Sequence, residues 1–126
     1  MRQLEFQRVI RRQDLQENPT KYYLFGDNVQ RVGNGGQAAQ MRGEPNAVGI
    51  PTKWAPRRDE SSYFSKSKDD WPHIKQIIDD AFASIPDNVT VVVPVNGIGT
   101  GLAELVQRWP EVLVYIEYKI KELGCQ

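Results

Sequence analysis

The stretch VPVNGIGTG, residues 93–101, is an apolar strand that leads directly into a glycine-rich loop. Residues 89–95 are almost all β-branched, which is typical of a strand buried on both faces of a sheet. Residues 102–105 follow the glycines and are predicted to form the first turn of a helix. Such a unit offers free backbone N–H groups and the positive end of a helix dipole to an anion. A plain tight turn, in which glycine only supplies a positive φ, explains this stretch equally well when it is taken alone.

A second glycine-rich loop lies upstream and favours an anion-binding cleft. Residues 22–25 are predicted to form a strand, which leads into Gly26-Asp27-Asn28 and then into GNGGQAA, residues 33–39. Two strand ends that each open into a glycine loop and a helix suggest one cleft at the carboxyl edge of a sheet, where α/β folds bind ligands. Neither loop has the Gly-Lys-Ser/Thr of a P-loop or the spacing of a dinucleotide fingerprint. A mononucleotide P-loop enzyme and an ordinary Rossmann dehydrogenase are therefore disfavoured.

Length and composition narrow the function classes further. The 126 residues predict a single domain spanning residues 1–126. Sixteen basic and sixteen acidic residues cancel, so no global field attracts the chain to nucleic acid or to an anionic membrane. With one cysteine, Cys125, and one histidine, His73, a Cys/His metal site is ruled out, and we expect no metal and no cofactor. No apolar run is long enough to span a membrane and no signal peptide is recognisable, so we expect a cytoplasmic protein.

Strands that alternate with helices predict a layered α/β domain. Apolar residues between Ile74 and Ile85 recur at helical spacing, after a helix start marked by Asp70 and Pro72. Residues 54–68 are predicted to be a long irregular loop, a type of segment that either covers a ligand or is simply mobile. The predicted strands are residues 4–10, 22–25, 47–51 and 89–95, and the other predicted helices are residues 13–18, residues 37–42 and a last one from Pro110 to Gly124.

The two glycine loops, their order and the strand before each resemble those of a macrodomain, the fold that binds ADP-ribose and its derivatives. The match extends over about residues 4–105 and includes an early Asp14-Leu15, where the family has an Asp that accepts the adenine amino group. Residues 50–53, Ile-Pro-Thr-Lys, resemble the strand end of the branch that removes ADP-ribose from acylated groups and uses the lysine as nucleophile. The resemblance implies a compact three-layer α/β/α domain with a central mixed sheet.

One position departs from that branch. The branch has an acid directly after the Gly-Leu of the second loop, whereas this chain has Ala103 there and Glu104 one residue later. A shift of one residue along a helix rotates a side chain by about 100°. Glu104 is therefore expected to be turned from the direction in which that acid faces the ribose.

The resemblance and the chemistry of the residues together imply a set of site residues. They imply a protein that binds ADP-ribose or a derivative and hydrolyses an ADP-ribosyl linkage or ADP-ribose-1″-phosphate. The alternative is a non-catalytic binder or sponge of ADP-ribose-type signalling nucleotides. The expected partners are that nucleotide and an ADP-ribosylated protein or nucleic acid, but no membrane. The candidate catalytic residues are Lys53, Glu104 and Asn28, and the candidate ligand-binding residues are Asp14, Asp27, Gly35, Gly36, Gln37, Gly97, Ile98, Gly99, Thr100 and Gly101.

Several of these side chains have a second, purely structural interpretation. Lys53 is either a desolvated amine or a solvent-facing lysine at a strand end, and Asp27 either orients a water or stabilises a turn. Arg42 pairs either with phosphate or with Glu44. The aromatic residues of the long loop either stack on adenine or pack on the core; they are Trp54, Tyr63 and Phe64.

Overall fold

The computed structural model describes residues 2–124 and shows strands alternating with helices, so the α/β class is confirmed. One short 3₁₀ helix, η1, lies in the long loop after β3. In chain order the elements are β1 (Gln3–Gln7), α1 (Arg12–Glu17), β2 (Lys21–Asn28), α2 (Ala38–Met41), β3 (Ala47–Lys53), η1 (Glu60–Ser62), α3 (Trp71–Ala83), β4 (Thr90–Pro94), α4 (Leu105–Arg108) and α5 (Pro110–Leu123).

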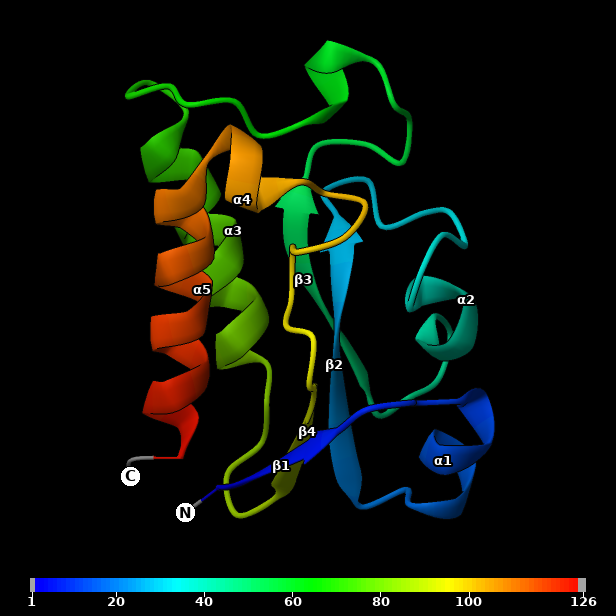
Figure 1. The fold of residues 1–126 in the computed structure, drawn as a ribbon. Coiled ribbons are helices and arrows are strands. Elements are labelled where there is room, and N and C mark those ends of the chain that lie inside the picture. Colours follow the sequence, from blue (N-terminus) through cyan, green and yellow to red (C-terminus); the bar gives the residue numbers. More distant parts are fainter. Residues whose placement is uncertain (1, 125–126) are drawn as a thin grey trace.

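The four strands form one sheet in the order β1-β4-β2-β3, and every neighbouring pair is parallel. The prediction of a mixed sheet is therefore wrong. A helix follows each of β1, β2 and β3, and such a crossover returns the chain to the edge at which the previous strand began. The carboxyl ends of β2 and β3 consequently lie together at the upper edge of the sheet in Figure 1, whereas the shorter β4 ends lower and the loop that follows it runs up toward them.

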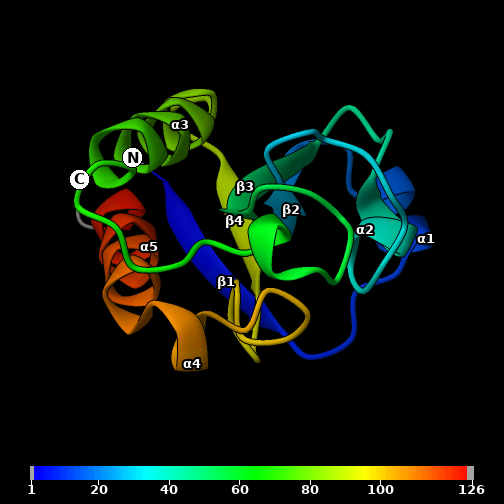
Figure 2. The same cartoon turned by 90° about the horizontal axis from the view of Figure 1, so that it is seen from above.

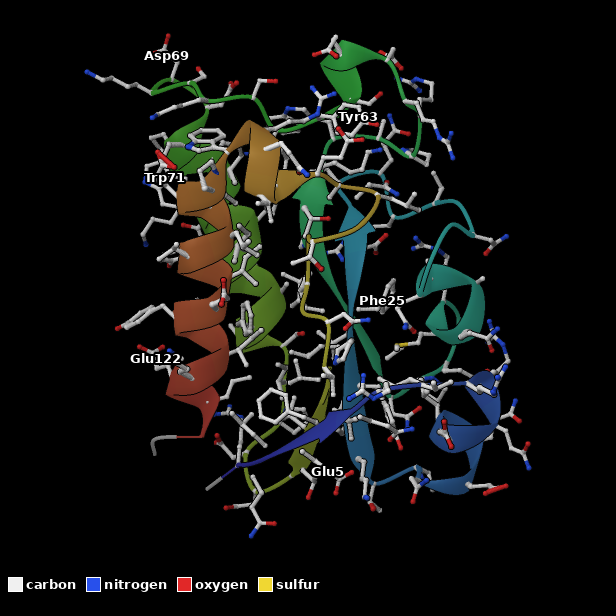
Figure 3. The ribbon with its side chains drawn as sticks, in the orientation of Figure 1. Glu5, Phe25, Tyr63, Asp69, Trp71 and Glu122 are labelled. Carbon is white, nitrogen blue, oxygen red and sulfur yellow. The ribbon has the colours of Figure 1, made fainter. Side chains whose placement is uncertain are left out.

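Helices cover both faces of this sheet, α3 and α5 on one side and α1 and α2 on the other (Figures 1 and 2). Successive residues of β2 point to opposite faces, and both sets are buried. Leu24 belongs to the core under α3 and α5, whereas Tyr23 and Phe25 belong to the core under α1 and α2. Figure 3 shows the Phe25 side chain directed toward α2. The apolar runs in the sequence thus reflect strands buried on both faces.

The longer helices agree well with the sequence pattern. Helix α3 carries its buried side chains at Ile74, Ile78 and Phe82, and α5 begins at Pro110 as predicted. Strand β3 runs to Lys53, two residues beyond the predicted end, which places Thr52 and Lys53 inside the sheet. Among residues 2–124, no helix has the length and apolar character that a membrane crossing requires.

Candidate functional site

A pocket of about 670 Å³ opens among the loops that follow β2, β3 and β4 at the carboxyl edge of the sheet. Its volume falls within the usual range of small-molecule sites. All the candidate site residues predicted from the sequence line it, except Asp14 and Ile98. The structure therefore brings the two glycine loops, Asn28, Lys53 and Glu104 to one cavity.

The loop after β4 depends on glycine. Gly97 and Gly99 have φ of +88° and +86°, in the left-handed region. A Cβ atom on Gly99 would lie 2.5 Å from the Leu105 Cδ1 atom, so this position also lacks space for a side chain. Ile98 is buried in the core beneath the loop. Within residues 2–124, the N–H groups of residues 98–101 have no hydrogen-bond acceptor, and Gly99, Thr100 and Gly101 line the pocket.

The loop after β2 is held by a buried ion-pair network. The Asp27 carboxylate, 5% exposed, accepts hydrogen bonds from Arg42 Nη2 at 2.5 Å and from Arg31 Nη1 at 3.1 Å. Arg42 also donates through Nε to the carbonyl of Gly33 at 2.7 Å. Arg42 thus pairs with Asp27 and not with Glu44, which pairs with Arg12, while a contact of Arg42 with phosphate stays a prediction. The network ties the glycine loop to the end of β2.

Two amide side chains of residues that line the pocket carry unpaired acceptor atoms. Asn28 is 6% exposed and donates through Nδ2 to the carbonyl of Val32 at 2.7 Å. Its Oδ1 atom and the Oε1 atom of Gln37 are buried and have no hydrogen-bond partner among the described residues. Buried polar atoms are nearly always paired in proteins. Both residues line the pocket, so a ligand with hydrogen-bond donors would satisfy them.

Lys53 is a buried amine, so the solvent-facing interpretation is wrong. Its side chain ends β3, is 7% exposed and donates through Nζ to the carbonyl of Arg57 at 2.8 Å. The same Nζ lies 4.2 Å from the centre of the Tyr63 ring. Burial lowers the pKa of Lys53, and the positive charge of Arg58 acts in the same direction. The neighbouring Thr52 hydroxyl donates to the carbonyl of Asp27 at 2.9 Å.

Glu104 lines the pocket because of a backbone conformation that the sequence does not predict. The predicted helix at residues 102–105 is wrong, because α4 begins only at Leu105. Glu104 precedes it in the left-handed conformation with φ of +54°, so its direction does not follow helical geometry. The side chain lines the pocket, and its Oε1 atom accepts a hydrogen bond from Arg108 Nε at 3.0 Å.

Asp14 lies in the first turn of α1, apart from the residues that line the pocket. Its Oδ2 atom accepts hydrogen bonds from the backbone N–H of Arg11 at 2.9 Å and from Gln7 Nε2 at 3.0 Å. The first of these bonds satisfies an amide at the start of the helix. The adenine contact of Asp14 stays a prediction.

The aromatic residues of the long loop divide between the core and the pocket. Trp54 packs edge-on against the fully buried Phe64, with ring centres 4.9 Å apart, and His73 stacks on Trp54 at 6.0 Å. These contacts support the packing interpretation for Trp54 and Phe64. Tyr63 instead lines the pocket, and Arg108 covers its ring at 3.8 Å.

Sequence reasoning missed Arg8, Arg58 and Arg108. Arg8 and Arg58 line the pocket, and Arg108 contacts Tyr63 and Glu104. These arginines lie outside any motif, and a lone arginine in a sequence carries no positional signal. Among residues 2–124, no group of three or more acidic, histidine or cysteine side chains is placed to hold a metal ion.

Comparison with known families identifies the class of this chain. The model of DUF7831, a family of unknown function, matches residues 5–119. The match covers far more than half of the chain, so the protein belongs to this family. No curated protein and no solved structure matches the chain.

Proposed function

We propose that the pocket binds ADP-ribose or a closely related nucleotide sugar. The carrying observation is that residues with unpaired acceptor atoms and residues with free backbone donors line the same cavity. The N–H groups of residues 99–101 suit phosphate oxygens, which only accept hydrogen bonds when fully ionised. The orphan oxygens of Asn28 and Gln37 need donors, which sugar hydroxyls supply and ionised phosphates do not. A ligand that joins phosphate to sugar satisfies both sets.

The charge of the pocket supports an anionic ligand. Arg8, Lys53 and Arg58 line it, and within the described residues none of the three forms an ion pair with a carboxylate. The whole chain, in contrast, has a formal net charge of zero. Positive charge is therefore concentrated where the ligand would lie, as binding of a diphosphate requires.

The fold is compatible with this proposal. A layered α/β/α domain whose strands end in two glycine loops is compatible with a nucleotide site at the carboxyl edge of its sheet, although the all-parallel sheet differs from the mixed sheet that the macrodomain resemblance implied. The macrodomain assignment itself is part of the proposal, carried by the loop sequences and by their meeting at one cavity.

A hydrolase is the activity that the burial of Lys53 favours. A desolvated lysine is a stronger nucleophile at neutral pH because more of it is unprotonated. With the diphosphate at the loop after β4, we place the distal ribose beside Lys53, and Glu104, which lines the same pocket, is the candidate acid–base group. The linkage attacked would be an ADP-ribosyl ester, amide or phosphate. A non-catalytic binder would use the same contacts without turnover.

The decisive experiment is a thermal-shift and calorimetry panel with ADP-ribose, ADP-ribose-1″-phosphate, ADP and adenosine. A ligand present at a hundred times its Kd should stabilise the fold by about 2.7 kcal/mol. We expect ADP-ribose to bind more tightly than ADP, because only the former satisfies donors and acceptors at both ends. If no member of the panel raises the melting temperature, the proposal fails.

Turnover is tested separately on ester-, amide- and phosphate-linked ADP-ribose. Borohydride should trap a Lys53 adduct in the parent protein and none in Lys53→Ala, as expected for a Schiff-base route. Lys53→Ala should lose turnover while ADP-ribose affinity stays within about tenfold, because the phosphate contacts remain. Binding without turnover in the parent protein would establish the binder instead.

A further inference from the structure

The ring of Tyr63 lies in contact with two cations. The Arg108 guanidinium carbon is 3.8 Å from the ring centre and the Lys53 ammonium is 4.2 Å from it. Tyr63 is 5% exposed and pairs with Lys53 in an isolated antiparallel bridge. Figure 3 shows Tyr63 beside the loop that carries η1, above the carboxyl edge of the sheet. The loop therefore contacts the Lys53 ammonium through the Tyr63 ring as well as through the Arg57 carbonyl.

Besides contacting that ring, Arg108 binds two carboxylates. Its Nε atom donates to Glu104 Oε1 at 3.0 Å, and its Nη1 and Nη2 atoms donate to the Glu60 carboxylate at 2.8 and 3.2 Å. Glu60 begins η1, and Glu104 lines the pocket. One planar guanidinium thus joins α4, η1 and Tyr63, which the rigid fork of arginine allows and a lysine ammonium does not.

We propose that Arg108 is the positioning residue of this site, a clamp that holds residues 57–63 over Lys53 and holds the Glu104 carboxylate at the pocket wall. The effect of this clamp on ligand binding rests on the proposed function, because only a ligand that contacts Lys53 would be affected by it. Arg108 does not itself line the pocket and acts through Tyr63 and Glu104.

The clamp should have a measurable effect on the pKa of Lys53, because several charged groups face this residue. Arg108 faces it from α4, Glu104 from the residue before α4, and Arg58 and Asp59 from the loop after β3. Loss of the Arg108 side chain would admit water to Lys53, remove a nearby positive charge and leave Glu104 without its partner. Each of these three changes favours the ammonium form, so they raise the pKa of Lys53 together.

The test is the pH dependence of acylation at Lys53, followed by peptide mass spectrometry with the exposed Lys68 as internal reference. In Arg108→Gln the labelling midpoint of Lys53 should rise by about one pH unit or more relative to the parent. Lys66→Gln is the matched control, because it removes a positive charge from the same loop at an exposed pair with Glu111. That control should keep the parent midpoint. An unchanged midpoint in Arg108→Gln overturns the proposal.

Arg108→Lys separates a clamp from a simple charge effect. It keeps the positive charge but loses the fork and the flat contact with Tyr63, so the midpoint should still rise. A parent-like midpoint in this variant overturns the clamp. If Arg108→Gln does not unfold cooperatively, Tyr63→Leu and Tyr63→Phe provide the same test. Only Tyr63→Leu, which removes the ring that both cations contact, should shift the labelling midpoint of Lys53. Equal midpoints in Tyr63→Leu and Tyr63→Phe overturn the proposal.

Labelling uses no nucleotide, so it can fail independently of the proposed function. A second measurement connects the two: Arg108→Gln should weaken ADP-ribose about tenfold, or 1.4 kcal/mol, and leave ADP, which lacks the distal ribose, unchanged. Equal weakening of both ligands overturns the positioning role. If the parent binds no ADP-ribose, the proposed function fails while the labelling midpoint still decides whether the clamp exists.

Discussion

Gly99 combines two constraints at one backbone position. Its φ is +86°, and a Cβ atom there would press on Leu105. Gly99→Ala should cost at least about 1 kcal/mol of unfolding free energy, because alanine is strained at positive φ. Gly101→Ala is the matched control, since nothing lies within 4 Å of its added Cβ and its φ is not positive.

Binding adds a second measurement at the same residue. Gly99→Val should abolish ADP-ribose binding, because a β-branched side chain distorts the loop that presents the N–H groups. Denaturant unfolding of each variant shows whether the domain still folds. A folded Gly99→Val protein with unchanged affinity would move the phosphate site elsewhere.

Burial of Lys53 makes stability depend on pH. Its folded pKa is lowered from the ordinary 10.5, so between the two values the unfolded chain binds more protons. Unfolding free energy therefore increases with pH in that window, by about 1.4 kcal/mol for each unit of pKa lowering. The parent should gain stability relative to Lys53→Met between neutral pH and about pH 10 in urea unfolding. A difference between the two proteins that stays constant with pH would contradict the burial.

At the scale of elements, the conformation of the loop after β2 depends on the hydrogen bonds of Arg42 to Asp27 and to the Gly33 carbonyl. Arg42→Lys keeps the charge but cannot reach Asp27 and the Gly33 carbonyl at once, so the loop loosens. ADP-ribose affinity by calorimetry should fall by about tenfold, or 1.4 kcal/mol. Arg12→Lys, which alters a pair with Glu44 outside the pocket, should leave affinity unchanged.

Helix α1 provides the next prediction, because Asp14 serves its first turn. Asp14→Ala should cost about 1 kcal/mol of stability through loss of the bond from the Arg11 N–H group. If Asp14 also accepts the adenine amino group, ADP-ribose should weaken by about 1.5–3 kcal/mol and the preference over the hypoxanthine analogue should disappear. Stability loss with intact adenine preference would leave Asp14 only its role in the helix.

The elements differ in how far the sequence predicts them. Strands β2 and β4 and helices α3 and α5 follow from long apolar patterns that local spacing determines. The start of α4 does not, since Leu102 and Ala103 suit a helix while Glu104 adopts a left-handed conformation. The partners of Arg42 and Arg108 are set by tertiary packing between distant segments, which no spacing rule encodes.

At the scale of the whole molecule, zero net charge and a positive pocket predict a specific salt effect. Raising ionic strength from about 0.05 to about 0.5 M should weaken the affinity for ADP-ribose several-fold. The reason is that salt screens the attraction between the phosphates and Arg8, Lys53 and Arg58. Adenosine, which has no charge, should bind equally at both concentrations in the same calorimetric titration. Equal salt sensitivity of the two ligands would show that the pocket charges do not contact phosphate.

The strand order has a consequence for how the chain acquires its structure. Strand β1 pairs only with β4, which also lies between β1 and β2. During synthesis, β2 and β3 can pair early, but β1 has no neighbour until residues 90–94 emerge. Because parallel pairing between distant segments is slow, the first strand should be the last to gain protection from hydrogen exchange during refolding. The N-terminal strand β1 can therefore join the sheet only after β4 has formed.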